Sequence, residues 1–220
     1  MPEYPPIANH GLIGDLQSAA LISADGAVDW FCAPRFDSPS IFASLLDQER
    51  GGHFTIAPAH DDVTVRQLYL PDTAVLITRF LTPEGVGEVV DFMPVNDRPD
   101  VPTDRHRLVR ALRVVRGTLT FDVTCRPRFD YGRAPHTLAL DGAVAGFHGP
   151  GLDVHLRSSV PLEADGQDVR ATVTLGHGQT AGIVLETSAP GATDPGPITE
   201  EAVQAVLEET RVFWHGWMRR

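Results

Sequence analysis

The amino-acid sequence predicts an all-β fold: a large antiparallel β-sandwich (supersandwich-like) of about a dozen strands with a C-terminal amphipathic helix. Short apolar runs with a two-residue period recur between residues 19 and 187, and Gly-containing turns separate them. A turn every ~8 to 12 residues favours a meandering sandwich over βαβ units. We therefore expect a sandwich domain over residues 1–187, a linker over 188–197 and the helix over 198–220.

The first predicted hairpin joins Ala19–Ser23 to Ala27–Cys32 through a tight turn that contains Asp25-Gly26. Pro34 and Pro39 follow, and they end strand pairing and stiffen the chain. The Ser-Pro-Ser sequence at residues 38–40 predicts a helix cap, so we expect a short helix over residues 41–47. Residues 11–15, which begin and nearly end with glycine, are predicted as a turn.

The middle and end of the sandwich are predicted from the same signals. Strands are expected over residues 53–57, 63–70, 73–81 and 86–93, the last two joined by a Pro-Gly turn at 82–85, and residues 96–104 form a loop. Strands over 107–115 and 118–125 flank Arg116-Gly117. Alternating strands over 152–157 and 169–175 follow, with turns at Asp141-Gly142, Asp165-Gly166 and Gly176-His177-Gly178.

One helix is predicted after the Pro-rich and Gly-rich residues 188–197. Thr199 is the expected N-cap, and Ile198 before it can pack on Val203. An apolar stripe with a 3.6-residue period follows, formed by Val203, Val206, Leu207, Thr210, Phe213, Trp214 and Trp217. Because water disfavours such a stripe, we expect Phe213, Trp214 and Trp217 to dock the helix on the sandwich or on another domain, with both tryptophans largely buried.

Charge limits the classes of partner. The chain has 220 residues, a formal net charge of −11 and a pI near 5.1. Most of its surface would repel a nucleic-acid backbone or an anionic membrane, so we expect neither as a partner. All 18 basic residues are arginine, which excludes a Schiff-base lysine, a P-loop lysine and a Ser-Lys dyad. A neutral or polar small ligand, or another protein surface, remains open.

The cysteines and histidines predict neither a disulfide framework nor a metal site. Cys32 and Cys125 are too few for the disulfides of a small secreted domain, and residues 1–4 lack signal-peptide features, so we expect a cytoplasmic protein. No apolar run approaches the ~20 residues that a membrane span needs. The nine histidines are dispersed without metal-ligand spacing, so no metal and no cofactor is expected.

The pattern C-x-P-R-F-D occurs at the end of two predicted strands, at residues 32–37 and 125–130. In each copy, the Arg and the Asp two positions later can form a charge-assisted hydrogen bond that fixes the loop. The two loops are either strand exits alone or one surface that faces a sugar or a catalytic domain. The residues expected on that surface are Asp29, Trp30, Arg35, Phe36, Asp37, Arg128, Asp130 and Tyr131.

Segments spread over nearly the whole chain resemble one known family. They are Ile13-Gly14-Asp15, Ala19-Ala20-Leu21, Asp25-Gly26, Asp29-Trp30, residues 34–39, Asp91-Phe92-Met93-Pro94, Val109-Arg110, residues 127–133 and residues 210–217. Together they resemble the N-terminal, trehalase-like domain of bacterial and archaeal glycoside hydrolase family 15 proteins, the glucoamylase and trehalase-like group. The resemblance implies a β-sandwich that precedes an (α/α)6 barrel, in which the two catalytic glutamates of such proteins lie.

Residue 220 comes before any such barrel could begin. The resemblance therefore implies a non-catalytic domain that supports an α-glucoside-hydrolysing barrel, either in cis or in trans. It also implies an α-glucoside such as trehalose as a further ligand. The alternative is a freestanding carbohydrate-binding or protein-interaction module. Hydrolysis by this chain alone would need two carboxyl groups in different environments. Asp29 and Asp37 flank the first loop, but Arg35 favours the ionised form of Asp37, so we assign no catalytic residue.

Overall fold

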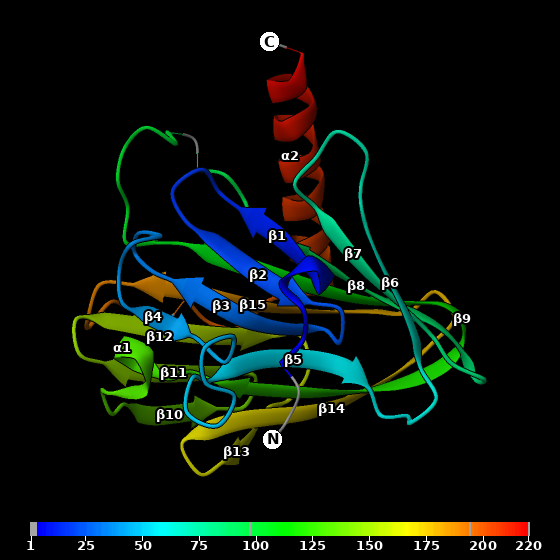
Figure 1. Ribbon diagram of the computed structural model, residues 1–220, viewed down its shortest axis with the longest axis horizontal. Coiled ribbons are helices and arrows are strands. Elements are labelled where there is room, and N and C mark those ends of the chain that lie inside the picture. Colours follow the sequence, from blue (N-terminus) through cyan, green and yellow to red (C-terminus); the bar gives the residue numbers. More distant parts are fainter. Residues whose placement is uncertain (1–3, 97, 194, 220) are drawn as a thin grey trace.

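The computed structural model describes residues 4–96, 98–193 and 195–219. Its strands pair antiparallel and form one hydrogen-bonded network of 15 strands, with helix α2 (Glu200–Met218) at the C-terminal end (Figure 1). The all-β prediction is confirmed. The strands exceed the predicted dozen because three short ones lack a clear sequence pattern: β1 (His10–Gly14), β4 (Ser40–Phe42) and β13 (Glu163–Asp165).

The network folds into two sheets that share strand β9 (Arg107–Arg126). The first sheet has the order β13-β14-β9-β5-β3-β2-β1, with β4 beside β3; its further strands are β2 (Ala19–Ser23), β3 (Ala27–Cys32), β5 (His53–Pro58) and β14 (Asp168–Gly176). The second sheet has the order β6-β7-β8-β9-β15-β12-β11-β10: β6 (Thr64–Tyr69), β7 (Leu76–Leu81), β8 (Gly85–Phe92), β10 (Thr137–Asp141), β11 (Val144–Gly149), β12 (Leu152–Ser158) and β15 (Thr180–Ser188).

Strand β9 corrects the prediction of two strands around Arg116-Gly117. Residues up to Arg116 pair with β8 and β15, residues from Thr118 onward pair with β5 and β14, and the chain continues without a turn. Gly117 has a φ of +76°, and a Cβ there would lie 1.9 Å from the carbonyl oxygen of Glu84. A glycine therefore lets one strand bend and pass from one sheet to the other, a device known from orthogonal sandwiches.

The core lies between the sheets. The largest buried cluster includes Phe31, Phe54 and Phe121 from the first sheet and Leu112 and Phe147 from the second. The alternation predicted for residues 118–125 and 169–175 is confirmed, since the apolar positions of both strands are buried in this cluster. Both sheets therefore contribute one apolar face to a common core, as sandwich packing requires.

A buried ion pair connects the two sheets through this core. Arg110 of β9 and Asp91 of β8 are fully buried, with Nε of Arg110 2.8 Å from Oδ1 of Asp91. The guanidinium also donates to the carbonyl oxygens of Phe54 (2.6 Å) and Gly26 (2.7 Å) in the first sheet, and it lies 4.8 Å from the ring centroid of Phe54. Both buried charges thus have partners, and removal of either residue would leave the other charge buried without its ion-pair partner.

Two predictions near the N-terminus are wrong. Residues 11–15 do not form a turn, because β1 pairs along its length with β2; Gly11 permits this, since a Cβ there would lie 2.4 Å from the side chain of Leu76. Residues 41–47 do not form a helix. Ile41 and Phe42 are both buried, and Phe42 pairs with Phe31, so tertiary packing selects strand β4 followed by turns.

Helix α2 begins as predicted, with Thr199 accepting a hydrogen bond from the backbone N–H of Ala202 at 3.2 Å. Its first half covers the other face of the second sheet, where Val203 is buried against a cluster that includes Val109 and Val184. The second half rises away from the sandwich, with the C-terminal end of the chain at its tip (Figure 1). No helix in the described ranges is long and apolar enough to cross a membrane.

Residues 189–193 and 195–197 lie beside β12 and change the exposure that its sequence predicts. Arg157 donates to the carbonyl oxygen of Gly196 at 2.6 Å, and Asp153 accepts a hydrogen bond from the backbone N–H of Gly191 at 2.8 Å. The alternation predicted for residues 152–157 places Asp153 and His155 on the polar face of the strand, yet they are only 3% and 4% exposed. This segment covers the face that the alternating pattern predicts to be open.

Candidate functional site

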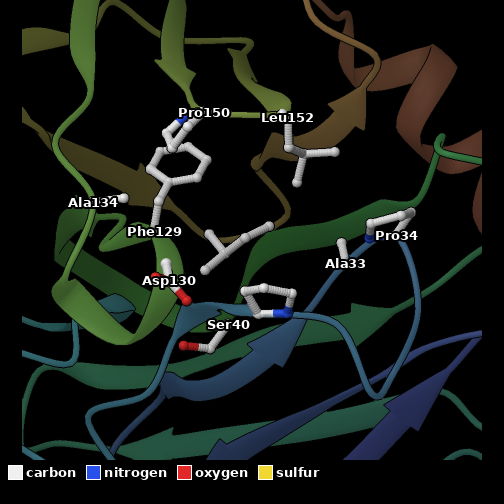
Figure 2. A pocket seen from close by; sticks show the side chains of 11 residues that line it. Ala33, Pro34, Ser40, Phe129, Asp130, Ala134, Pro150 and Leu152 are labelled. Carbon is white, nitrogen blue, oxygen red and sulfur yellow. The ribbon is translucent and has the colours of Figure 1, made fainter.

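The two C-x-P-R-F-D loops lie at the same end of the sandwich, as the hypothesis of one surface requires. The backbone N–H of Arg128 donates to the carbonyl oxygen of Ile41 at 2.8 Å, and the short helix α1 (Phe129–Gly132) packs against β4. Between the loops is a pocket of about 440 Å³, with Pro34 on one wall and Phe129 on another (Figure 2). Its lining is Ala33, Pro34, Pro39, Ser40, Ile41, Phe129, Asp130, Ala134, Pro150, Gly151 and Leu152.

The first loop is displayed to solvent and closed by its own ion pair. Nε and a terminal nitrogen of Arg35 each lie 2.8 Å from an oxygen of Asp37, so the predicted charge-assisted bond forms and is bidentate. These side chains are 69% and 51% exposed, and Phe36 between them is 70% exposed. An exposed aromatic ring beside a fixed ion pair is a typical element of a protein or sugar interface.

The second loop departs from the predicted internal pair. Arg128 makes its ion pair with Asp168, at the start of β14, and Arg126 binds the same carboxylate at 3.0 Å. Burial alone would raise the pKa of Asp168, but the bonds and charges of Arg128 and Arg126 outweigh it and lower that pKa. Asp130 is instead 2.7 Å from Arg133. The same six-residue pattern therefore forms a different set of contacts here.

Asp130 and Tyr131 have left-handed backbone conformations, with φ values of +51° and +58°. Such values are uncommon for residues other than glycine and cost free energy, so they are often found where a side chain must be aimed. They bring the Tyr131 ring to 6.3 Å from the ring of Trp30, centroid to centroid, and the guanidinium of Arg133 lies over the Tyr131 ring, 5.5 Å from its centroid. Trp30 and Tyr131 thus form an aromatic pair beside the loop pocket.

One polar atom in the pocket wall is unsatisfied. Ser40 is 1% exposed, and its hydroxyl has no hydrogen-bond partner among the described residues. The rest of the wall is mainly proline and aliphatic or aromatic carbon, and its single carboxylate is that of Asp130. This composition suits an inserted apolar or aromatic group with one polar atom, and it lacks the two carboxylates of a glycosidase site.

Asp29 does not face the loop pocket. Its carboxylate accepts a hydrogen bond from Nε2 of His10 at 2.7 Å, and it lines a separate cavity with Asp25 and His53. Burial, and secondarily the charge of Asp25, raises the pKa of Asp29 although His10 opposes the shift. Asp29 and Asp37 therefore do not share a cavity. The described residues also contain no group of three His, Cys, Asp or Glu side chains placed to hold a metal ion.

The three aromatic residues of α2 form their own cluster. Phe213 lies 5.3 Å from Trp214 and stacks on Trp217 at 6.0 Å, measured between ring centroids. Trp214 and Phe213 are half-buried, but Trp217 is 44% exposed, which contradicts the expectation that both tryptophans are largely buried. The reason is geometric. Helix α2 extends beyond the sheet beneath it (Figure 1), and near its end His215 lies 3.3 Å from the carbonyl oxygen of Pro71, in the turn after β6.

Three contributors to this end of the molecule were missed from the sequence. Ser40 is predicted only as part of a helix cap, Asp168 is remote from both loops in the chain, and residues 150–152 carry no signal that places them beside Phe129. One signal was present. Gly149 precedes Pro150, and a Cβ at Gly149 would lie 2.6 Å from the ring of Phe129, so this glycine allows the second loop to pack on β11.

Comparison with known proteins gives consistent relatives. The sequence family described as "Trehalase-like, N-terminal" matches residues 2–211. Trehalases of Mycolicibacterium smegmatis, Mycobacterium tuberculosis and Thermoplasma volcanium are 30%, 28% and 28% identical to the chain and cover 98%, 98% and 97% of it. The chain spans only 35%, 34% and 34% of these curated relatives. With its sandwich and nearly its whole length matched, the chain belongs to the family of trehalase-like N-terminal domains.

Proposed function

We propose that this domain supports and shapes the entrance of an α-glucoside-hydrolysing (α/α)6 barrel of the glycoside hydrolase family 15 type, and that it performs no hydrolysis itself. One observation carries the proposal. The half of α2 that leaves the sandwich exposes an apolar surface spread around the helix, formed by Val212 (63%), Trp217 (44%) and Met218 (62%), and exposed apolar surface often marks protein contacts. The barrel covers this surface and the first loop, where Phe36 projects.

The relatives support the assignment of the barrel's substrate. Their printed names are trehalases, and roughly two thirds of their length lies outside the region that this chain matches. Trehalose is therefore the proposed α-glucoside, ahead of the starch-derived substrates of a glucoamylase. In this proposal the barrel follows in cis, residues 1–187 are the supporting domain, residues 188–197 are the linker and α2 is the connection. A cytoplasmic location fits the two free, buried cysteines.

A chimera tests the proposal. The region of the Mycolicibacterium smegmatis trehalase that matches this chain is replaced by the chain, and trehalose hydrolysis is compared with that of the relative lacking the region. We expect an active chimera, an inactive or unstable truncated relative, and no glucose release by the isolated chain. Trp217→Ser and Phe36→Ala should each lower the chimera's activity or melting temperature, whereas Arg170→Ala on the exposed face of β14 should not.

Two results would contradict this function. A truncated relative as active and as stable as the intact one would show that the barrel needs no supporting domain. Glucose release by the isolated chain that disappears in Asp29→Asn or Asp37→Asn would show that the domain is itself a hydrolase.

A further inference from the structure

A second cavity, of about 230 Å³, is built into the first sheet and shares no lining residue with the loop pocket. It lies where the turn between β2 and β3, the segment after β4 and strand β5 meet. Asp25 and Asp29 supply carboxylates to its wall, and Ser44, Gln48, His53 and Thr55 supply uncharged polar groups. Its volume is below the ~300 to 1,000 Å³ of clefts for drug-sized ligands, so it has room for one small molecule.

Asp29 is aimed toward this cavity by a β-bulge. Leu21 pairs with Trp30 and Ile22 pairs with Val28, so Asp29 is the extra residue on β3. Such bulges redirect a side chain and often lie next to functional sites. Asp29 is only 5% exposed, and while Oδ2 accepts a hydrogen bond from His10, Oδ1 is buried without a partner among the described residues. A buried carboxylate oxygen without a donor is costly, which points to a donor that the chain does not supply.

The neutral groups of the wall are also free to bind. Within the described ranges, no side chain or backbone group hydrogen-bonds the side chains of Ser44, Gln48, His53 or Thr55, whereas Ser23 at the edge is occupied by Asp25 and by the carbonyl oxygen of Ala27. Burial, and secondarily the charge of Arg126, lowers the pKa of His53, so its imidazole is neutral and has one donor and one acceptor. The amide of Gln48 likewise has both.

This combination selects the chemistry of the ligand. Two carboxylates disfavour an anion, and no three His, Cys, Asp or Glu side chains of the described ranges are placed to hold a metal ion. An organic cation would satisfy the carboxylates but would offer no acceptor to the amide of Gln48 and the N–H of His53. A molecule with several neighbouring hydroxyl groups both donates and accepts, and it satisfies every group in the wall.

We propose that this cavity binds one neutral monosaccharide unit, with vicinal hydroxyls donating to Asp29 and Asp25 and accepting from Gln48 and His53. The site is a non-catalytic sugar site, and it shares no lining residue with the pocket between the two C-x-P-R-F-D loops. The choice of D-glucose as the probe rests on the proposed function, because a trehalase releases glucose; the polyhydroxyl class itself rests only on the cavity. In the full protein the site would hold product or substrate near the domain without cleaving it.

The test uses the isolated chain and needs no catalytic domain, so its result is independent of the chimera. The ¹⁵N-labelled chain is titrated with D-glucose, and in parallel with ethylammonium chloride at matched ionic strength. We expect saturable amide shifts at residues 25–29, 44–48 and 53–55 with glucose only. Asp29→Asn removes a hydrogen bond to a charged group and should raise the Kd for glucose roughly tenfold or more. Gln48→Ala and Thr55→Val should each raise this Kd about threefold to tenfold. Asp165→Asn, at the exposed end of β13, is the matched control and should bind as wild type.

Three outcomes overturn the inference: no saturable shift with glucose, equal glucose binding by Asp29→Asn and Gln48→Ala, or saturable binding of ethylammonium in place of glucose. Asp29→Asn also loses the charge opposite His10, so its amide spectrum and thermal transition are recorded first. If that variant does not fold, Gln48→Ala and Thr55→Val decide alone, because neither side chain has a partner within the described part of the chain.

Discussion

The two copies of C-x-P-R-F-D have the same six-residue pattern but different surroundings. In the first copy, Phe36 is 70% exposed, and Arg35 pairs within its own loop. In the second copy, Phe129 is 4% exposed and belongs to the core, and Arg128 reaches out of the loop to Asp168. The first loop is therefore displayed on the sandwich, whereas the second is built into it.

This difference assigns the two loops separate tasks. Phe129 packs on Gly149 of β11 and lies 5.6 Å from the ring of His136, so the second loop fixes the wall of the pocket. Phe36 of the first loop is mostly exposed instead, so this loop presents an aromatic ring that water disfavours. One copy of the motif is therefore structural and the other is available for contact. Substitutions at equivalent positions of the two copies should have different effects on stability.

The equivalent phenylalanines should show the largest contrast. Phe129→Ala leaves a cavity in the core and should lower the free energy of unfolding by about 3 to 5 kcal/mol, whereas Phe36→Ala at an exposed site should change it by less than about 0.5 kcal/mol. Urea unfolding followed by tryptophan fluorescence measures both. Similar losses for the two variants would contradict the assignment of Phe129 to the core and Phe36 to the surface.

The equivalent arginines should differ by less. Arg128 and Asp168 have side chains only 24% and 12% exposed, so Arg128→Ala leaves a mostly buried carboxylate with one partner fewer and should cost about 1.5 to 3 kcal/mol. Arg35→Ala breaks a solvent-exposed pair worth at most about 1 kcal/mol. The same unfolding experiment ranks them. Arg35→Ala more destabilising than Arg128→Ala would show that the first loop, not the second, is the structural copy.

Sequence reasoning succeeded where the signal was local. The hairpin at Asp25-Gly26, the N-cap at Thr199 and the charge-assisted Arg35–Asp37 bond each depend on residues within four positions of one another, and all three are present. It failed where distant packing decides. Residues 41–47 have a helix-like start, but Phe42 is more strongly stabilised as a strand residue beside Phe31 in the core.

The candidate site divides along the same line. The repeated C-x-P-R-F-D pattern predicts that both loops lie together. It does not predict that Arg128 pairs with Asp168, 40 positions away, and not with Asp130. The bulge at Asp29 is likewise invisible, because one extra residue in β3 shifts the register only against its partner strand. Asp29 was therefore expected beside Trp30 on the loop surface, although it faces the other cavity.

Acid should weaken the second loop more than the first. Asp168 has a folded-state pKa below its ordinary value of 3.8, so it stabilises the fold above that value, and this contribution is lost as the pH falls through the lowered pKa. The stability difference between wild type and Asp168→Asn should thus be constant from pH 5 to 7 and shrink below about pH 4. Asp165→Asn serves as the exposed control. A difference that does not shrink in acid would mean that Asp168 is not the carboxylate that the arginines hold ionised.

The smallest difference between the two copies is expected at the cysteines that begin them, and it should appear only as a difference in thiol reactivity. Burial, with the charge of Asp37, raises the pKa of Cys32 to about 11, and burial, with the charge of Asp168, raises the pKa of Cys125 further above its usual range. Neither thiol should react quickly with iodoacetamide near neutral pH, since the thiolate is the nucleophile.

Local opening should nevertheless favour Cys32, because the first loop has fewer buried contacts than the second. We expect mass spectrometry at pH 9 to find Cys32 alkylated first, and Asp37→Asn to speed that reaction because it removes a negative charge that opposes ionisation. Asp165→Asn should leave both rates unchanged. Equal rates at Cys32 and Cys125 would show that the two copies open together, and the division into a displayed loop and a built-in loop would then fail for dynamics even if it held for stability.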